Sequence, residues 1–341
     1  MTTTDITVLK QLTAIRLDVA IWTARRKLTP ADFGSSDLPP EKLASLGSKK
    51  VCNPEDLRIF ATLKARAIAV LERTGVRFLG GWAIPEAKTA AVVRELTRIG
   101  QDFENARDLF LSRYDQAIRQ WIADNPGWES LIAGSTVGVD TVRSRLSFGW
   151  QVFRVAPPHR TGRNGAAAAS LEAEVGGLSQ TLFTEVAKAA SVAWRKTFTG
   201  KTEVSHKAVS SLKTIKEKLA GLAFVDPRVM PMADLVDHVL SGLPTRGRIV
   251  GEPLVRLQGL VGLLRDPVVL TDCGRRLLDG ENPDTLLEGL NPTPGDGLPE
   301  EGGPASDEKT DPVGDPEDRE EFEDDTALPV EGPCLDSLGL W

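Results

Sequence analysis

The stretch VVRELTRIGQDFENARDLFLSRYDQAIRQW, Val92–Trp121, carries the clearest periodic signal in this chain of 341 residues. Its apolar residues recur at intervals of three or four, which is close to a heptad seam along one face of a helix. Pro85 suits the first position of such a helix, and Asn125-Pro126-Gly127 suits its end. We therefore expect a helix over about 86–124, so long that it projects or packs along another long helix. The seam consists of Val92, Leu96, Ile99, Phe103, Ala106, Phe110, Tyr114, Ala117 and Trp121.

A second seam predicts another helix over about 166–199, weakened at Gly176-Gly177. We expect the two helices to pair as a long antiparallel, coiled-coil-like hairpin, joined through the segment between them. The sequence leaves open whether they pair within one chain or between two copies. The second seam consists of Leu171, Val175, Leu178, Leu182, Val186, Ala189 and Ala193.

Two stretches have the pattern of strands. Residues 15–21 alternate apolar with polar or small side chains, and residues 148–155 are rich in strand-forming side chains before Pro157-Pro158. Pairing between these strands is compatible with the sequence. The predicted fold class is mainly α with a small β element, in which the long helical hairpin dominates.

Further helices are predicted from capping signals and from prolines. One starts after Asn53 as N-cap, with Pro54 at its first position, and runs to about Arg73 before Gly75. Shorter helices are expected at 205–219, 232–240, 253–264 and 272–278.

The charge of the chain is divided unevenly. Residues 291–341 contain 16 acidic and 2 basic residues, a net charge of −14, and are rich in Pro and Gly. Residues 1–290 contain 39 basic and 32 acidic residues, a net charge of +7. We therefore expect a folded body over 1–290 and a disordered acidic tail over 291–341.

Cysteine usage and hydropathy indicate a cytoplasmic protein. Cys52, Cys273 and Cys334 lie far apart, which excludes a disulfide framework and a CxxC metal pair. The N-terminus has no basic segment followed by an apolar one, and no run of 18 apolar residues is present. We expect neither a secretion signal nor a membrane span.

The chain offers little that predicts catalysis or a cofactor. Gly200-Lys201-Thr202 lacks the upstream glycine of a phosphate-binding loop and follows a predicted helix instead of preceding one. The three histidines stand alone, which argues against a metal site. Asp234 and Asp237 lie on one helix face, where a solvated surface explains them at least as well as acid–base chemistry. We expect no catalytic, cofactor-binding or metal-ligating residues, and an enzyme is not the favoured class.

A basic and aromatic cluster lies around the second predicted strand. Arginines that neutralise phosphates beside aromatic rings that stack on bases would form a single-stranded nucleic-acid site. The favoured alternative is a strand whose aromatic rings face the core and whose arginines face water. The candidate residues are Arg143, Arg145, Phe148, Trp150, Phe153, Arg154, Arg160 and Arg163.

The C-terminal tip, EGPCLDSLGLW, is apolar although the tail before it is acidic. Leu335, Leu338 and Trp341 lie three residues apart, so a short helix would align them for a groove on a partner, with Leu340 beside them. The alternatives are a tip that folds back onto its own body and a tip without a role.

Several strings together resemble an uncharacterised bacterial and phage family, a domain of unknown function. They are WTARRKLTPADF, PEKLASLGSKKVCNPEDL, FATLKARAIAVLERTGVRFLGGWAIP, YDQAIRQWIADNPGW, RSRLSFGWQVFRV and GLAFVDPRVMP, and they span most of residues 12–265. The resemblance implies a gene on a mobile element near a MoxR-type AAA ATPase and a von Willebrand-domain protein, similar to cobaltochelatase subunits. The leading expectation is a non-catalytic interaction protein, an adaptor or component of such an ATPase system. The alternative is a single-stranded nucleic-acid-binding protein.

Overall fold

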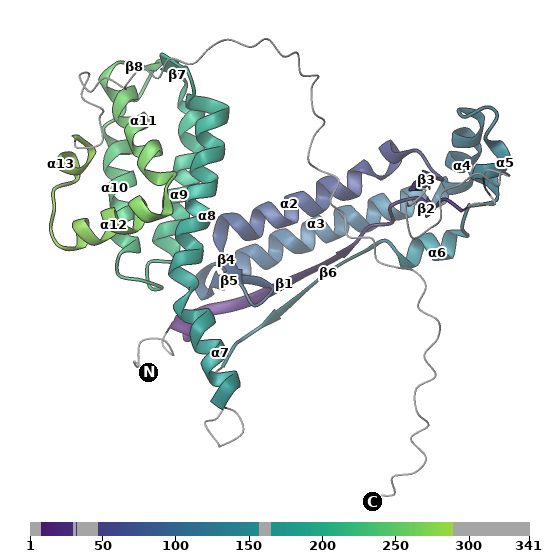
Figure 1. Cartoon of the computed structure of the whole chain (residues 1–341), viewed down its shortest axis with the longest axis horizontal. Helices are drawn as coiled ribbons and strands as arrows, with labels where there is room; N and C mark the ends of the chain where they lie inside the picture. Colours follow the sequence, from purple (N-terminus) through teal and green to yellow (C-terminus); the bar gives the residue numbers. More distant parts are fainter. Residues whose placement is uncertain (1–7, 30–31, 33–46, 157–164, 289–341) are drawn as a thin grey trace, which may run out of the picture. The chain divides into compact units, whose positions relative to one another are not determined.

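The computed structural model describes residues 8–29, 32, 47–156 and 165–288, all within one compact unit, Met1–Pro292. The unit is mostly helical with a small antiparallel sheet (Figure 1). In the described part of the chain, no helix is both long and apolar enough to cross a bilayer.

A four-stranded antiparallel sheet forms the middle of the unit, in the order β4-β5-β1-β6. Its central strand β1 pairs with β5 on one side and with β6 on the other, so both predicted strand regions are strands and they are neighbours. Gly81 suits the close approach of β5 to β1, because a Cβ there would lie 2.5 Å from the carbonyl oxygen of Ile15. The strands are β1 Leu12–Ala20, β4 Val76–Phe78, β5 Gly81–Pro85 and β6 Ser147–Phe153.

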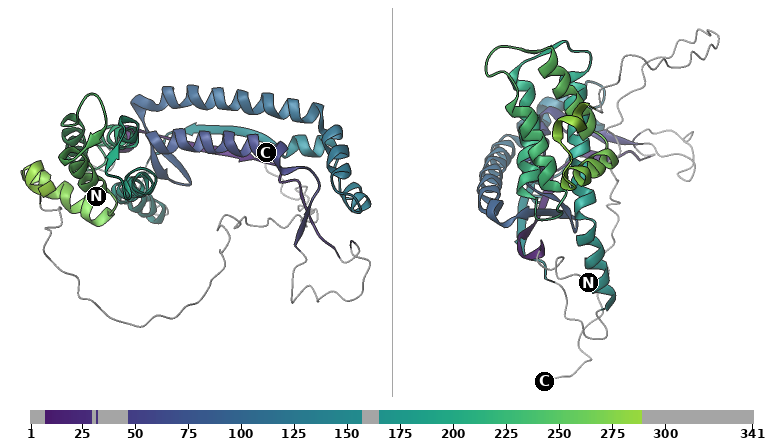
Figure 2. Two further views of the ribbon diagram at one scale, coloured as in Figure 1. Left: turned by 90° about the horizontal axis from the view of Figure 1, so that it is seen from above. Right: turned by 90° about the vertical axis from the view of Figure 1, so that its left-hand side faces the viewer.

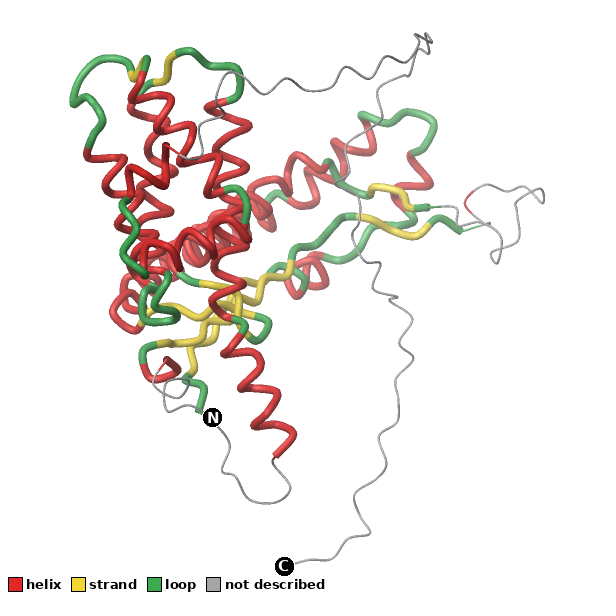
Figure 3. Tube along the Cα trace, turned by 60° about the vertical axis from the view of Figure 1, so that its left-hand side comes forward, coloured by secondary structure: helices red, strands yellow, loops and turns green. Residues whose placement is uncertain are grey.

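Two long helices, α2 Arg58–Thr74 and α3 Glu86–Ser112, pack side by side against one face of this sheet. The strands, yellow in Figure 3, run alongside the pair. The entry to α2 follows the capping signal: Asn53 accepts from the backbone N–H of Glu55 at the start of the 3₁₀ turn η2 Pro54–Leu57, and Gly75 follows the last residue of α2.

The predicted helix over 86–124 is divided into two. The backbone of Arg113 leaves helical geometry, with φ −113° and ψ 10°, and α4 Tyr114–Ala123 begins after it. The change of direction keeps Tyr114 in the core, with its ring 5.8 Å from that of Trp22 and its hydroxyl donating to the carbonyl of Val137. Two short helices follow, α5 Glu129–Ala133 and α6 Val139–Ser144.

The predicted helix over 166–199 is also divided, at the Gly176-Gly177 pair. It comprises α7 Gly165–Gly176, α8 Leu178–Ala193 and the π-helical turn η3 Trp194–Phe198. The expected long hairpin between the two seams is not confirmed. Helix α3 packs against α2, whereas α8 packs against α9, α11, α12 and β4.

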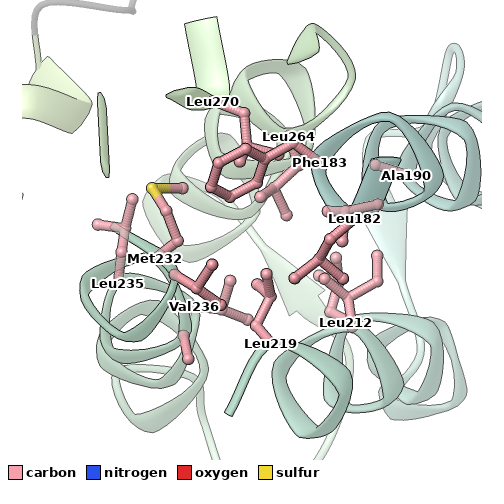
Figure 4. Close-up of a cluster of buried hydrophobic side chains, with 14 of the residues drawn as sticks. Leu182, Phe183, Ala190, Leu212, Leu219, Met232, Leu235, Val236, Leu264 and Leu270 are labelled. Atoms are coloured by element: carbon pink, nitrogen blue, oxygen red, sulfur yellow. The ribbon is translucent and has the colours of Figure 1, made fainter. Parts of the chain in front are cut away.

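Each seam is instead the core face of a different hydrophobic cluster. Val92, Leu96 and Ile99 belong to a cluster built from α2, α3, α4, β1 and β5. Leu178, Leu182 and Val186 belong to a second cluster, which helices α8 to α12 form with β4 (Figure 4). The periodicity therefore located most of the buried positions, although Ala189 of the second seam is exposed and its neighbour Ala190 is buried, but it did not identify the elements that cover them.

A series of shorter helices packs around the second cluster. All four helices expected in this region are present, and α12 starts earlier than expected because Asp266 caps it ahead of Pro267. The elements are β7 Glu203–Val204, η4 His206–Val209, α9 Ser210–Gly221, α10 Val229–Ser241, β8 Ile249–Val250, α11 Glu252–Leu264, α12 Pro267–Leu278 and α13 Pro283–Glu288.

A buried lysine on α9 connects the two clusters. Lys218 on α9 donates to Glu185 on α8 at 2.6 Å and to the carbonyl of Glu72 on α2 at 2.7 Å. The other carboxylate oxygen of Glu185 accepts from the backbone N–H of Arg77 on β4 at 2.9 Å. The side chain of Lys218 is only 8% exposed, so these contacts satisfy an ammonium group that water barely reaches.

Candidate functional site

Two of the three aromatic residues of the predicted nucleic-acid patch face the core. Phe148 and Trp150 on β6 are half-buried and lie against α3 at Gly100, where a Cβ would be 3.2 Å and 3.3 Å from their rings. The ring of Phe148 also lies 5.6 Å from that of Phe103. Rings packed in this way present little free surface on which a base could stack.

The arginines of the patch are spread over different surroundings. Arg143 in the last turn of α6 and Arg145 just after it are exposed. Arg154 pairs with Glu86 at 2.5 Å. The pKa of Glu86 is lowered, first by a hydrogen bond from Thr13 and then by Arg154.

Some predicted site residues lie outside the described residues. These are Arg160 and Arg163 of the patch, and Leu335, Leu338, Leu340 and Trp341 of the C-terminal tip. Phe153 and its neighbour Val152 are described, and both are exposed at the end of β6, 39% and 45% respectively.

The structure brings together a different set of basic residues. Strands β2 Arg25–Lys27 and β3 Ser48–Lys50 pair antiparallel as a two-stranded ribbon, in which Arg25 is opposite Lys50 and Lys27 is opposite Ser48. Five of the six strand residues are basic. In the left-hand view of Figure 2 the ribbon leaves the layer formed by α2 and α3. We call β2 and β3 the basic ribbon.

An aromatic cluster fixes the base of the basic ribbon. Trp22, which precedes β2, is buried against Phe110 and Tyr114, with ring centroids 6.4 Å and 5.8 Å away. Val51, which follows β3, is buried and donates its N–H to the carbonyl of Ala24. On α4, the indole N–H of Trp121 donates to the carbonyl of Lys50 at 3.2 Å. The ribbon is therefore attached to the core through both of its strands.

One face of the basic ribbon carries three exposed cations. Side chains alternate along a strand, so Arg25, Lys27 and Lys50 share one face, and all three are exposed. On the other face Lys49 pairs with Asp32 at 2.6 Å, and this hydrogen bond lowers the pKa of the Asp32 carboxyl. Within the described residues, no carboxylate forms an ion pair with Arg25 or Lys50.

Sequence reasoning missed the basic ribbon although its signal was present. The strings ARRK and SKK are each short, and about twenty residues rich in Gly, Pro and Ser separate them. The cations that lie close together in sequence are instead those around β6. The useful signal was a pair of basic segments flanking a turn-rich loop, which is the pattern of a hairpin with charged strands.

Residues 9–266 match a protein family described as "Protein of unknown function (DUF3150)". The chain belongs to this family. The matched region includes the basic ribbon and the four-stranded sheet, and it excludes the acidic segment from residue 291 onward. No curated protein and no solved structure matches the chain.

Asp237 and His238 form ordinary surface pairs, and Asp234 is exposed. Asp237 pairs with Lys216 at 2.7 Å, and His238 lies 3.1 Å from Asp284, which also pairs with Arg256. Gly200 has a φ of 66° and follows η3, so it ends a helix. Among the residues that the structure describes, no group of three or more His, Cys, Asp or Glu side chains is arranged to hold a metal ion.

Proposed function

We propose that this chain is a non-catalytic nucleic-acid-binding protein whose basic ribbon contacts the phosphate backbone. The observation that carries the proposal is the exposed face of Arg25, Lys27 and Lys50, on which Arg25 and Lys50 have no carboxylate partner among the described residues. Exposed cations without a carboxylate partner attract the phosphates of a nucleic acid and release the counterions condensed on those phosphates. This release is the main source of sequence-independent affinity.

The construction of the ribbon supports the same role. A binding surface works best when its charged groups need not be ordered at the moment of binding. Here the strands are paired, and the aromatic cluster around Trp22 together with the bond from Trp121 to Lys50 anchors both of them. The backbone beneath the cations is therefore fixed in advance.

The test compares two triple variants of the full-length chain that lose the same net charge. Arg25→Gln/Lys27→Gln/Lys50→Gln removes the exposed cations of the ribbon. Lys64→Gln/Lys88→Gln/Arg94→Gln removes three exposed cations from α2 and α3. Binding to a fluorescent DNA is measured by anisotropy over a range of salt concentrations.

The ribbon variant is expected to bind at least about tenfold more weakly, and its slope of log K against log salt should fall by about 2 to 3. The α2–α3 variant should keep most of the affinity and most of the slope. Equal losses in the two variants would mean that net charge alone is responsible, and the proposal would be wrong.

A second candidate function is docking of a protein partner, as an adaptor in an ATPase system of a mobile element. The observation that favours it is the exposure of Val152 and Phe153, adjacent apolar side chains on β6, the last strand of the sheet. Apolar side chains on an edge strand suit addition of an extended partner segment. The family resemblance suggests a MoxR-type AAA ATPase or a von Willebrand-domain protein as the partner.

Co-purification followed by mass spectrometry, with and without ATP, tests this second function. Three full-length preparations are compared: the natural chain, Val152→Ser/Phe153→Ser, and a chain lacking Leu338–Trp341. Loss of one partner in the β6 variant would support docking on the sheet edge, and loss in the shortened chain would support docking by the tip. The same partners in all three preparations would contradict both.

A further inference from the structure

We infer that the nucleic acid bound by the basic ribbon is a duplex, and that the ribbon enters its major groove. This inference rests on the proposed function and adds the class of ligand and the mode of docking. It departs from the single-stranded ligand that the residues around β6 indicated.

The width of the ribbon matches the major groove of a duplex better than the minor groove. Neighbouring strands lie about 4.8 Å apart, so a two-stranded ribbon with its side chains matches the major groove of B-DNA, which is about 12 Å wide. The minor groove is about 6 Å wide and does not admit such a ribbon without deformation of the duplex.

The length of the ribbon matches a short segment of duplex. Backbone bonds extend the pairing by one residue at each end, from Val51 N–H to the carbonyl of Ala24 and from Leu28 N–H to the carbonyl of Gly47. Five residues in each strand span about 17 Å at 3.3 Å per residue. That length corresponds to about five base pairs at 3.4 Å each.

The aromatic residues argue against a single-stranded ligand. Binding of single strands relies on rings that stack on successive bases. Trp22 and Tyr114 are buried, Trp121 is half-buried with its N–H bonded to Lys50, and β6 turns Phe148 and Trp150 toward α3. Among the described residues, the exposed aromatic side chains are Trp128 on the α4–α5 connection and Phe153 on β6, and neither is on the ribbon.

The experiment measures affinity for a duplex and for a single strand of one sequence, with the full-length chain. Three proteins are compared: the natural chain, the ribbon variant Arg25→Gln/Lys27→Gln/Lys50→Gln, and the aromatic variant Trp128→Ala/Phe153→Ala. A further duplex carries bulky glucosyl groups on its cytosines, which fill the major groove, and netropsin serves as a competitor that fills the minor groove.

The natural chain is expected to prefer the duplex by about tenfold, and the ribbon variant should lose about tenfold on it. The aromatic variant should stay within about twofold of the natural chain, because stacking contributes nothing to duplex binding. Glucosylation should weaken binding about tenfold, whereas netropsin should leave it unchanged.

Each contrary result has a distinct meaning. If the single strand binds as tightly as the duplex and the ribbon variant still loses affinity, the inference is overturned while the proposed function stands. The inference is also overturned, with the proposed function intact, if netropsin competes and glucosylation has no effect. If neither nucleic acid binds, or if the ribbon variant binds like the natural chain, the proposed function fails and the inference fails with it.

Discussion

Gly274 on α12 lies where that helix crosses the start of α10. A Cβ at this position would lie 2.9 Å from the carbonyl oxygen of Arg228 and 3.1 Å from its Cβ. Neither atom can move without moving the backbone that begins α10. Gly262 on the neighbouring helix α11 faces open space, with no atom within 4 Å of a Cβ. The same residue type is therefore required by packing at one position and is only a weak helix former at the other.

Gly274→Ala and Gly262→Ala are expected to change stability in opposite directions. Gly274→Ala should lower the free energy of unfolding by about 1–3 kcal/mol, because it overpacks a close helix crossing. Gly262→Ala should raise it by about 0.5–1 kcal/mol, because alanine favours the helix and restricts the unfolded chain. Urea unfolding followed by circular dichroism measures both. A rise in the free energy of unfolding in both variants would show that helix propensity, not packing, controls position 274.

The thiols of Cys52 and Cys273 are expected to be unreactive in the folded protein. Burial raises the pKa of each to about 11, and the carboxylate of Asp56 adds to the effect at Cys52. A raised pKa disfavours the thiolate, so at pH 8 only about one thiol in a thousand would be ionised. In a Cys334→Ser chain, Ellman's reagent should label neither residue at pH 8, and the rate should rise up to pH 10. Labelling in denaturant provides the full signal, and rapid labelling of the native chain at pH 8 would refute the prediction.

Single residues also mark the limits of inference from sequence. The cap at Asn53, which begins the turn η2 leading into α2, was readable because a side-chain oxygen, a proline and acidic residues stand in the order that a helix start requires. The break at Arg113 was not readable, because no glycine or proline marks it. Its cause is the packing of Tyr114 against Trp22, which is about ninety residues away in sequence.

At the scale of elements, periodicity predicts which face of a helix is buried but not what covers it. The seam containing Val92 and Leu96 and the seam containing Leu178 and Leu182 are both buried, yet they lie in separate clusters. The partner of α3 is α2, whose own apolar face was not recognised as a match. Which of several helices with similar apolar faces pack together depends on the lengths of the loops and on the sheet between the helices. A heptad pattern contains no information on either.

The pair formed by Lys218 and Glu185 holds α8 and α9 to β4 of their own cluster and to α2 of the other cluster. Lys218→Met should lower the free energy of unfolding by about 3 kcal/mol, because it leaves the half-buried carboxylate of Glu185 without its cation. The double variant Lys218→Met/Glu185→Leu should recover at least part of this loss, since replacing both charges by apolar groups removes the unpaired charge. A double-mutant cycle measured by urea unfolding checks this, and additive losses would contradict it.

At the scale of the whole molecule, composition and pattern predicted a mainly helical protein with a small β element, and the structure has this fold class. They also indicated two of the four strands, β1 and β6, which pair with each other. The functional surface was harder to predict, because the cations of β2 and β3 become neighbours only when the strands pair. Conversely, Phe148 and Trp150 looked like a binding surface only while their packing against α3 was unknown.

The position of β1 has a mechanical consequence for whatever the basic ribbon holds. Strand β1 is hydrogen-bonded on both sides, to β5 and to β6, and the chain passes from its last residue, Ala20, into the ribbon at Arg25. The hydrogen bonds of an antiparallel ladder lie perpendicular to the strands. Tension along β1 therefore loads these bonds in shear, all at once, and does not open them one after another. A force on the ribbon that reaches β1 is shared between its hydrogen bonds to β5 and those to β6. The aromatic cluster around Trp22 lies between β1 and the ribbon.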